Sequence, residues 1–362
     1  MDLNAALWAV LGLVTLTIGA EALVRGAARL AAAAKISPLV IGLTVVAFGT
    51  SAPELAVSVR SAFTGQADIA FGNVVGSNIL NVLLILGLSA LITPLRVSLK
   101  LIRVDAPIMV LFSLLLLVLV QDGLVSRAEG ALLAALLAGY LSLAAVLGRR
   151  EGKRAAAAEF EAEYGERTVR RPQPLIDLLL VGAGLGALVL GAGWFVEAAA
   201  ALARAFGVSE LVIGITIVAA GTSLPEVATS VVASIKGERD IAVGNVVGSN
   251  IFNILAVLGI SSLVSPTGVA VAQAAIGFDV PVMVAVAVAC LPIFFTGHTI
   301  ARWEGAVFLA YYVIYTIHLL LTATQHAALP AFSHVLGWYV LPLTALTLVV
   351  SSYRALRAAR LT

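Results

Sequence analysis

Windows of about 20 apolar residues recur along almost the whole chain, and they restrict its fold more than any other feature of the sequence. A helix that crosses a bilayer needs about 20 largely apolar residues. Only 12% of the 362 residues are charged, against roughly 25% in an ordinary soluble domain. The sequence therefore predicts an all-α, polytopic membrane protein with eleven spans, at approximately residues 5–32, 38–63, 69–92, 105–121, 128–148, 175–203, 210–235, 241–263, 279–297, 302–322 and 335–353.

The charge balance and the scarcity of cysteine argue against several classes of function. The net charge is only +2, so no basic surface is available to neutralise a nucleic-acid backbone. The single cysteine, Cys290, cannot form a disulfide within the chain, and no histidine pair has metal-finger spacing. The first residues, 1–8, lack the basic start of a cleavable signal. We expect a mature membrane protein that needs no nucleic acid, cofactor or obligate protein partner.

Basic residues are distributed unequally between the two sides of the membrane. With the N-terminus outside, 19 Lys and Arg residues fall inside, and only Arg60, Arg127 and Arg204 fall outside. Cytoplasmic loops carry such an excess of basic residues. We therefore expect a multi-pass plasma (inner) membrane protein with its N-terminus outside and its C-terminus in the cytoplasm. The mixed-charge stretch Arg149–Pro174 is expected to be a cytoplasmic linker, too short for a regulatory domain.

The chain contains an internal duplication. Residues 37–94 align without a gap on residues 209–266, with 35 identities in 58 positions. The loop 65–68 falls outside by the charge count and its counterpart 237–240 falls inside, so the copies cross the membrane in opposite senses. Inverted repeats are typical of secondary transporters. We expect two five-helix inverted repeats in residues 1–148 and 175–322, the linker in 149–174, and one extra C-terminal transmembrane helix with a basic tail in 323–362.

Two polar motifs recur inside apolar spans. Gly-Thr-Ser-x-Pro-Glu occupies residues 49–54 and 221–226, and a Gly-Asn-Val-Val-Gly-Ser-Asn-Ile-x-Asn motif occupies residues 72–81 and 244–253. Thr50 and Ser51 precede Glu54 by four and three residues, so we expect the side-chain oxygens of these three residues to share one helix face. The proline removes one main-chain hydrogen bond and displaces a carbonyl, which is tolerated at this depth only beside a cavity or inside protein.

Glu54 and Glu226 lie near the middle of their spans. A carboxylate there costs several kcal/mol unless it is paired or bound to a cation, and no lysine or arginine in these helices is placed to pair with it. We therefore expect a transported cation to supply the missing charge. The surrounding ligands are all oxygens, including the amides of Asn81 and Asn253, and they suit a hard cation such as Ca²⁺ or Na⁺.

Purely structural roles compete with these assignments. The glutamates could be protonated and hydrogen-bonded, although their position beside helix breaks argues against it. Asp105 and Asp279, each in an Asp-x-Pro sequence, are expected to be helix N-caps. Hydrogen bonding between helices is an equally good interpretation for Asn73, Asn78, Asn245 and Asn250, and close helix packing is expected at Gly72, Gly76, Gly244 and Gly248.

At these motifs the sequence resembles the cation/calcium exchanger superfamily, and more narrowly its sodium/calcium exchanger branch. The Gly-Thr-Ser-x-Pro-Glu and Gly-Ser-Asn-Ile-x-Asn pairs are similar to the two alpha repeats of that family, and the likeness covers helices one to ten. The resemblance implies a transporter, not an enzyme, that exchanges Na⁺ for Ca²⁺ by alternating access. It also implies that helices one and six slide across a rigid core.

The resemblance assigns roles to particular residues. Glu54 and Glu226 would be the central carboxylates shared by Ca²⁺ and Na⁺. Hydroxyls for flanking sodium sites would come from Thr50, Ser51, Thr222, Ser223, Ser77 and Ser249, and main-chain carbonyls from Ala47 and Ala219.

Comparison with the family also bears on the coupling ion. Proton-coupled relatives typically have Asn-Ala-Pro-Glu in the first motif, so the Thr-Ser pair here favours sodium. Potassium-dependent relatives, and several prokaryotic members, have aspartate in place of Asn253, which argues against potassium transport. Two carboxylates neutralise one Ca²⁺ or two Na⁺, so exchange of three Na⁺ for one Ca²⁺ would move net charge. The short linker has no room for the calcium-sensing domains of animal exchangers.

Three alternatives remain open on the sequence. The first is a proton/calcium antiporter. It can be distinguished from a sodium/calcium exchanger by testing whether a sodium gradient alone drives calcium flux. A cation channel would need a continuous polar path, whereas these polar residues cluster near the middle of the membrane. An intramembrane hydrolase would need a metal-binding histidine motif or a nucleophile with a base nearby, and neither is present in the sequence.

Overall fold

The computed structural model describes residues 3–34, 37–152, 174–205, 219–340, 342–344 and 346–347. Within these ranges eight helices are long and apolar enough to cross a membrane, and the bent pair Pro38–Thr50 and Ala52–Phe63 makes a ninth if it is one span. The prediction of a polytopic helical membrane protein is therefore confirmed. The predicted span 210–235 is described only from residue 219, the span 335–353 only in part, and the linker 149–174 only at its two ends.

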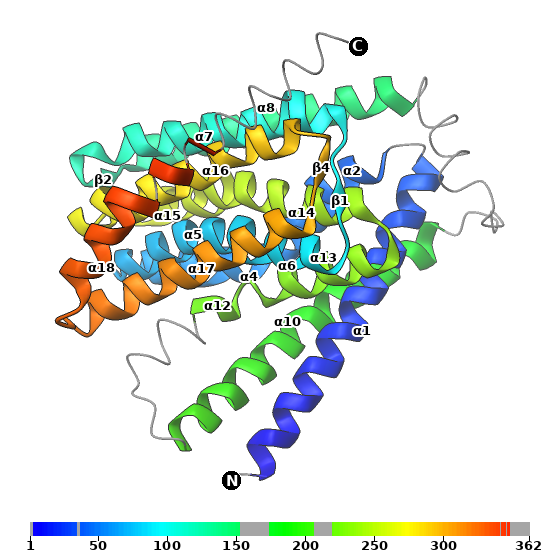
Figure 1. Cartoon of the computed structure of the whole chain (residues 1–362). Coiled ribbons are helices and arrows are strands. Elements are labelled where there is room, and N and C mark those ends of the chain that lie inside the picture. Colours follow the sequence, from blue (N-terminus) through cyan, green and yellow to red (C-terminus); the bar gives the residue numbers. More distant parts are fainter. Residues whose placement is uncertain are drawn as a thin grey trace.

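The first half consists of long helices interrupted by short π-helical turns, here labelled η (Figure 1). Such turns are rare and occur frequently at functional sites. The elements in chain order are α1 (Leu3–Ala34), α2 (Pro38–Ile41), η1 (Gly42–Val46), α3 (Ala47–Thr50), α4 (Ala52–Phe63), α5 (Ala67–Leu80), η2 (Asn81–Leu86), α6 (Gly87–Ile92), β1 (Leu95–Arg96), η3 (Leu101–Asp105), α7 (Ala106–Leu119), the 3₁₀ turn η4 (Val120–Asp122), β2 (Leu124–Val125) and α8 (Arg127–Gly152).

The described part of the second half repeats this order, except that no 3₁₀ turn precedes β4 and that α18 and η8 follow α17. In particular, the π-helical turn that follows the second polar motif begins at Asn81 in one half and at Asn253 in the other. The elements are α10 (Pro174–Ala205), α12 (Ala219–Gly221), α13 (Leu224–Lys236), α14 (Arg239–Phe252), η6 (Asn253–Leu258), α15 (Gly259–Val264), β3 (Val269–Ala270), η7 (Ala275–Asp279), α16 (Val280–Phe295), β4 (Thr299–Ile300), α17 (Arg302–Ala323), α18 (Leu329–Val335) and η8 (Leu336–Val340).

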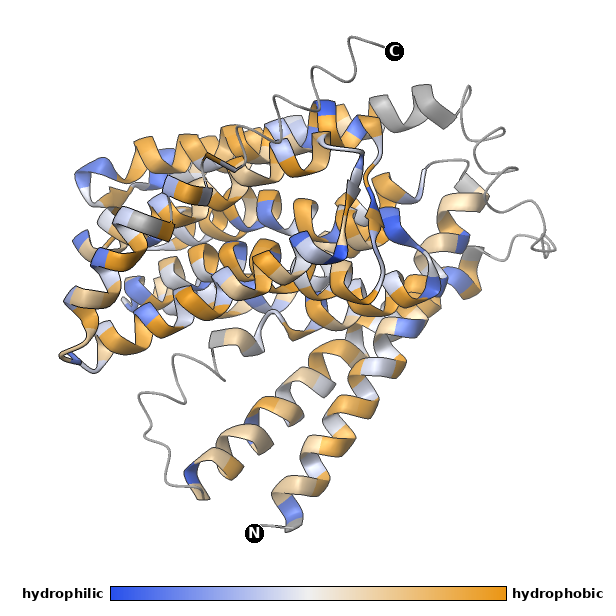
Figure 2. Ribbon diagram, in the orientation of Figure 1, coloured by the Kyte–Doolittle hydropathy of each residue, from blue (hydrophilic) through white to orange (hydrophobic). Residues whose placement is uncertain are grey.

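The centre of the molecule is formed by the helices that carry the second polar motif. The apolar window of Arg239–Val264 is entirely buried and that of Ala67–Ile92 is 72% buried, whereas that of Arg302–Ala323 is only 6% buried. The outer helices α1, α10 and α17 carry mainly apolar residues along their ribbons (Figure 2). Lipid is as apolar as a protein core, so the polar side chains are the ones that must face inward.

Helices α1 and α10 lie side by side and extend away from the other helices at the end where α1 begins (Figure 1). Glycines allow this contact. A Cβ atom added at Gly19 would lie 2.9 Å from the carbonyl oxygen of Gly184, and one added at Gly184 would lie 2.7 Å from the main-chain nitrogen of Leu23. Gly12 and Gly191 make an equivalent contact. The two backbones are therefore too close to admit a side chain between them.

Two short antiparallel ladders join the halves. Strand β1 pairs with β4, with Leu95 opposite Ile300, and strand β2 pairs with β3, with Val125 opposite Val269. Each ladder takes one strand from each half of the chain. The main chains of the two halves are therefore hydrogen-bonded to each other at two separate places.

Asp105 and Asp279 do not cap helices, so that prediction is wrong. The turns η3 and η7 precede α7 and α16 directly, and both aspartates have helical backbone angles and form no capping hydrogen bond. Asp279 instead accepts a hydrogen bond from the Tyr315 hydroxyl at 2.9 Å. The Asp-x-Pro pattern was misleading because the turn before each proline is π-helical and continues the helix rather than starting it.

The two glycine pairs of the second polar motif differ in how closely other helices pack against them. A Cβ atom added at Gly248 would lie 2.8 Å from the carbonyl oxygen of Leu43, and Gly244 is also packed against the first-half helix. The predicted close packing is confirmed for these two glycines. A Cβ atom added at Gly72 or Gly76 has no described atom within 4 Å, and the counterparts of Leu39 and Leu43 lie outside the described residues, so close packing there stays a prediction.

Candidate functional site

The motif Gly-Thr-Ser-x-Pro-Glu breaks a helix in both halves. Ser51 has φ −80° and ψ 6°, Ser223 has φ −88° and ψ 4°, and the first-half segments on either side of the break are bent by 45°. Pro53 and Pro225 occupy the second position of the helices that restart, where their missing N–H is not needed. The break predicted from the prolines is confirmed.

The two glutamates are buried in the first turns of the restarted helices. Glu54 is 0% exposed and Glu226 is 1% exposed, and each lies where the partial positive charge of a helix N-terminus favours a carboxylate. Each carboxylate accepts a hydrogen bond from the serine three residues before the other glutamate, so the two acids lie close together. The two broken helices therefore bring two acids from opposite halves of the chain to one buried place.

Each glutamate is hydrogen-bonded to a serine of the other half. Ser51 Oγ donates to Glu226 Oε1 at 3.0 Å, and Ser223 Oγ donates to Glu54 Oε1 at 2.8 Å. The sequence expectation placed Ser51 on the same helix face as Glu54. The bend at Ser51 does not separate the two side chains, because Ser51 Oγ contacts Glu226 and Glu54 Oε1 contacts Ser223 of the same opposite motif.

The threonines also bind across the halves, but to asparagines. Thr50 Oγ1 donates to Asn245 Oδ1 at 3.1 Å, and Thr222 Oγ1 donates to Asn73 Oδ1 at 3.1 Å. These contacts fit the interpretation of these asparagines as hydrogen-bond partners between helices. Each threonine gives its single proton to an amide oxygen, so the lone pairs of its own oxygen remain available to another ligand.

Two serines that the sequence analysis did not single out support these asparagines. Asn73 Nδ2 donates to Ser58 Oγ at 2.9 Å, and Asn245 Nδ2 donates to Ser230 Oγ at 3.0 Å. Ser58 and Ser230 are both buried and correspond at the repeat offset, so the alignment of the two copies contained the signal that could have found them.

The other candidate residues lie around the same centre. Ser77 Oγ is 3.0 Å from Ser223 Oγ, and Ser249 is 0% exposed. The Ala47 carbonyl oxygen accepts a hydrogen bond from Ser51 N at 3.0 Å and lies 3.4 Å from Thr50 Oγ1, and Ala219 is the first described residue of the helical segment before the second break.

The asparagines of the second motif form pairs between the two central helices. Asn81 Nδ2 donates to Asn250 Oδ1 at 3.0 Å, and Asn253 Nδ2 donates to Asn78 Oδ1 at 3.1 Å. All four side chains are buried, with at most 3% of their surface exposed. The two bonds are equivalent when the halves of the chain are exchanged.

Five buried oxygens of this centre form no hydrogen bond with the part of the chain that the structure describes. They belong to Glu54 (Oε2), Glu226 (Oε2), Asn81 (Oδ1), Asn253 (Oδ1) and Ser249 (Oγ). None of the ion pairs among the described residues includes either glutamate. Buried acceptors of this kind, two of them carboxylate oxygens, can coordinate a cation but would repel an anion.

Comparison with known proteins identifies the family. The family model described as "Sodium/calcium exchanger protein" matches residues 4–146 and 176–321, which include both broken helices and both central helices. The chain belongs to the sodium/calcium exchanger family. It is accordingly a multi-pass membrane antiporter and not an enzyme.

Individual exchangers and antiporters match over most of their length. The sequence is 43% identical to "Putative antiporter CaxA" of Alkalimonas amylolytica, over 80% of this chain and 89% of that protein. It is 35% identical to "Sodium/calcium exchanger MaX1" of Methanosarcina acetivorans, over 85% of this chain and 96% of that protein. A solved structure of the sodium-calcium exchanger NCX_Mj superposes with a TM-score of 0.73 at 33% identity, over 87% of this chain and 98% of that one.

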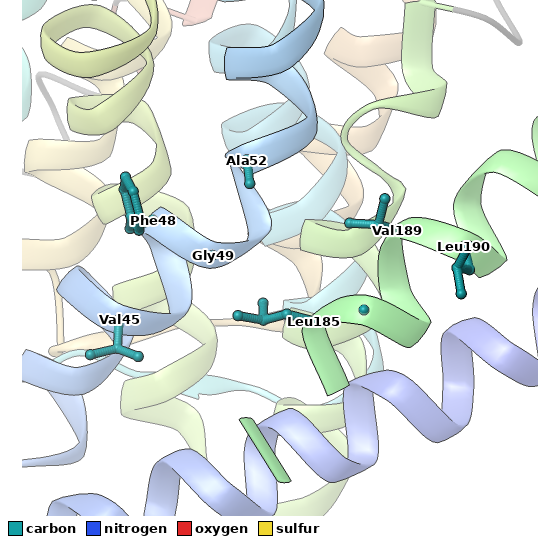
Figure 3. A pocket seen from close by; sticks show the side chains of 8 residues that line it. Val45, Phe48, Gly49, Ala52, Leu185, Val189 and Leu190 are labelled. Atoms are coloured by element: carbon teal, nitrogen blue, oxygen red, sulfur yellow. The ribbon is translucent and has the colours of Figure 1, made fainter. Parts of the chain in front are cut away.

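An apolar groove of about 650 Å³ lies beside the first break of this exchanger (Figure 3). Val45, Phe48 and Ala52 line one wall, and Leu185 and other residues of α10 line the opposite wall. Leu185 reaches so close that a Cβ atom at Gly49 would lie 2.6 Å from its Cδ1 atom. Helix α10 therefore covers Gly49, the residue before Thr50, with the apolar side chain of Leu185. A hydrated cation could not pass through this contact.

Proposed function

We propose that this exchanger-family chain exchanges Na⁺ for Ca²⁺, with Glu54 and Glu226 as the central cation ligands. The observation that carries the proposal is the meeting of two buried carboxylates that have no ion-pair partner among the described residues. An uncompensated carboxylate at membrane depth costs several kcal/mol, and a bound cation removes that cost. The coordinating atoms around them are oxygens, as Ca²⁺ and Na⁺ require.

The remaining candidate residues would complete the coordination. Ca²⁺ takes about 6–8 oxygen ligands, more than two carboxylates provide. Thr50, Thr222, Ser51 and Ser223 each donate their proton to another acceptor, so their oxygens can face a cation with a lone pair. The other ligands that we propose are the side-chain oxygens of Ser77, Ser249, Asn81 and Asn253 and the carbonyl oxygens of Ala47 and Ala219.

We propose that transport occurs by alternating access of two inverted repeats, with α1 and α10 as the moving pair. The duplicated sequence and the exchange-equivalent hydrogen bonds support two related halves. The ladders β1–β4 and β2–β3 tie the core halves together, whereas α1 and α10 are packed mainly on each other. Movement of α10 would withdraw Leu185 from Gly49 and open a path to the site.

Coupling should involve sodium and not potassium, and transport should carry charge. The site has two formal negative charges, and Asn253 supplies an oxygen without adding a third. Exchange of three Na⁺ for one Ca²⁺ would move one net charge, and a membrane potential acts on one charge with about 2.3 kcal/mol per 100 mV. Sodium-driven exchange without potassium should therefore produce a current.

Calcium uptake by proteoliposomes under separate Na⁺, K⁺ and H⁺ gradients tests this prediction. An outward sodium gradient alone should drive ⁴⁵Ca²⁺ uptake, and addition of potassium to both sides should leave the rate unchanged. A sodium concentration jump on a solid-supported membrane in potassium-free buffer should give a transient current. The Glu54→Gln protein provides the matched control for leak and surface binding.

Three results would contradict the proposed sodium/calcium exchange, each in a different way. A strict potassium requirement would refute the interpretation of Asn253. Equal uptake under a proton gradient without sodium would instead favour proton/calcium antiport, and calcium flux that does not depend on any counter-gradient would indicate a channel.

We propose a plasma-membrane location with the N-terminus outside and the C-terminus in the cytoplasm, on the basis of the 19 to 3 distribution of basic residues. In a Cys290→Ala background, Gln66→Cys should react with a membrane-impermeant thiol reagent in intact cells. Glu159→Cys, in the linker, should react only after permeabilisation. The reverse labelling pattern would show that the orientation is wrong.

A further inference from the structure

The chain has three methionines, and the two that follow Met1 both contact asparagines of the central helices. Met109 Sδ accepts a hydrogen bond from Asn250 Nδ2 at 3.4 Å, and Met283 Sδ accepts one from Asn78 Nδ2 at 3.6 Å. Met109 is 0% exposed and Met283 is 2% exposed. Helices α7 and α16 thus place equivalent sulfur atoms against equivalent amides.

A thioether sulfur can only accept a hydrogen bond, and this property fixes the direction of each amide. Because Asn250 turns its Nδ2 group toward Met109, its Oδ1 atom faces Asn81 and accepts from Asn81 Nδ2 at 3.0 Å. In the same way Asn78 Oδ1 accepts from Asn253 Nδ2 at 3.1 Å.

The consequence reaches the proposed cation ligands. Asn81 and Asn253 each use an Nδ2 hydrogen in these bonds, and their Oδ1 atoms form no hydrogen bond with the described residues. If Asn250 were rotated by half a turn, it would present Nδ2 to Asn81. Asn81 would then have to accept with Oδ1, and that oxygen would be lost to the cation.

We propose that Met109 and Met283 are positioning residues, whose sulfur atoms hold Asn250 and Asn78 in the one orientation that leaves the side-chain oxygens of Asn81 and Asn253 free for a cation. The inference rests on the proposed function, because it concerns the ligands of that same site. It adds two residues that lie outside the aligned repeat, at an offset of 174 instead of 172.

The two methionines differ in importance. Asn78 Nδ2 has a second acceptor, the main-chain oxygen of Asn250 at 3.3 Å, so its orientation survives without Met283. For Asn250 Nδ2, Met109 supplies the only hydrogen bond recorded within the described part of the chain. Loss of the Met109 sulfur should therefore have the larger effect.

The test compares Met109→Leu with Met283→Leu, substitutions that conserve side-chain volume and usually cost little stability. Met109→Leu should raise the half-saturating Ca²⁺ concentration of exchange by about fivefold, the equivalent of about one hydrogen bond. Met283→Leu should raise it by less than about twofold. Both proteins should keep their melting temperature in the absence of ions. An equal response of the two variants, or none from Met109→Leu, overturns the proposal.

A double-mutant cycle asks whether Met109 acts through Asn81. Asn81→Ala should itself raise the half-saturating concentration, and Met109→Leu should then add nothing to it. Additive effects overturn the positioning role and make Met109 a packing residue. An Asn81→Ala protein with unchanged calcium dependence contradicts the ligand assignment itself, so failure of the proposed site is distinguishable from failure of this inference.

Methionine methyl groups give a second measurement that does not require transport. With [¹³C-methyl]methionine the protein yields signals from three methionines, and the two leucine variants assign those of Met109 and Met283. Calcium addition to the detergent-solubilised protein should shift the Met109 signal in the wild type and not in Asn81→Ala. An identical shift in both proteins overturns the proposed link between Met109 and Asn81.

Discussion

Glu54→Gln and Glu226→Gln should each reduce sodium-dependent calcium exchange by more than about 100-fold. Each change removes one of the two formal negative charges of a buried site while keeping the size of the side chain. Breaking a buried charge pair costs about 3–5 kcal/mol, which corresponds to a factor of more than about 100 in affinity. The measurement is ⁴⁵Ca²⁺ uptake by proteoliposomes, with the amount of folded protein determined by size-exclusion chromatography.

Glu304→Gln is the matched control. Glu304 is also a buried glutamate near a helix start, with 8% of its surface exposed, but its carboxylate accepts from Ala301 N at 2.7 Å, an interaction that glutamine retains. Its uptake should equal that of the wild type. Near-normal uptake by Glu54→Gln or Glu226→Gln would show that the cation is held elsewhere.

Gly184→Ala should destabilise the protein and slow transport, whereas Gly186→Ala should do neither. A methyl group at position 184 would meet Leu23 N at 2.7 Å and Gly19 O at 2.8 Å, both main-chain atoms that cannot rotate away. Overpacking of this kind costs about 1–3 kcal/mol. At position 186 no described atom lies within 4 Å of the added methyl, and alanine is the better helix former by about 1 kcal/mol.

The two variants lie two residues apart on the same helix, so they share expression, lipid contact and helix propensity effects. Apparent melting temperature and uptake rate should fall together in Gly184→Ala and stay at or above the wild-type values in Gly186→Ala. Equal melting temperatures would mean that α1 and α10 are not tightly packed in the membrane. Gly186 lines the apolar groove beside the first break. A normal melting temperature with slow transport in Gly186→Ala would therefore indicate that the surface that moves during transport is this groove.

The membrane-spanning pattern and the pairing of the two polar motifs were predictable because both depend on local properties of the chain. The apolar windows are long enough to identify helices without knowledge of their neighbours. The prolines at positions 53 and 225 predict the helix breaks for an equally local reason. The duplication further indicated that the motifs act together, since it places each feature in both halves.

The partners of individual side chains were not predictable in the same way. Periodicity predicts which side chains share a helix face, but it does not predict that Ser51 binds Glu226 of the other half. The Asp-x-Pro sequence at Asp105 indicates an N-cap, but it does not distinguish the start of a helix from a π-helical turn that continues into one. The contact of Met109 with Asn250 joins positions 141 residues apart, and no local pattern reports it.

The serine–glutamate hydrogen bonds of the site stay the same when the two halves are exchanged, with Ser51–Glu226 matching Ser223–Glu54. Two separate identical chains could form such a site only around a twofold axis, and any substitution would then occur twice. The formal charge of that site could change only in steps of two. In the fused chain an acid can replace Asn253 while Asn81 stays neutral. Joining the copies therefore allows the formal charge of the site to change by one, which is the charge of one monovalent ion.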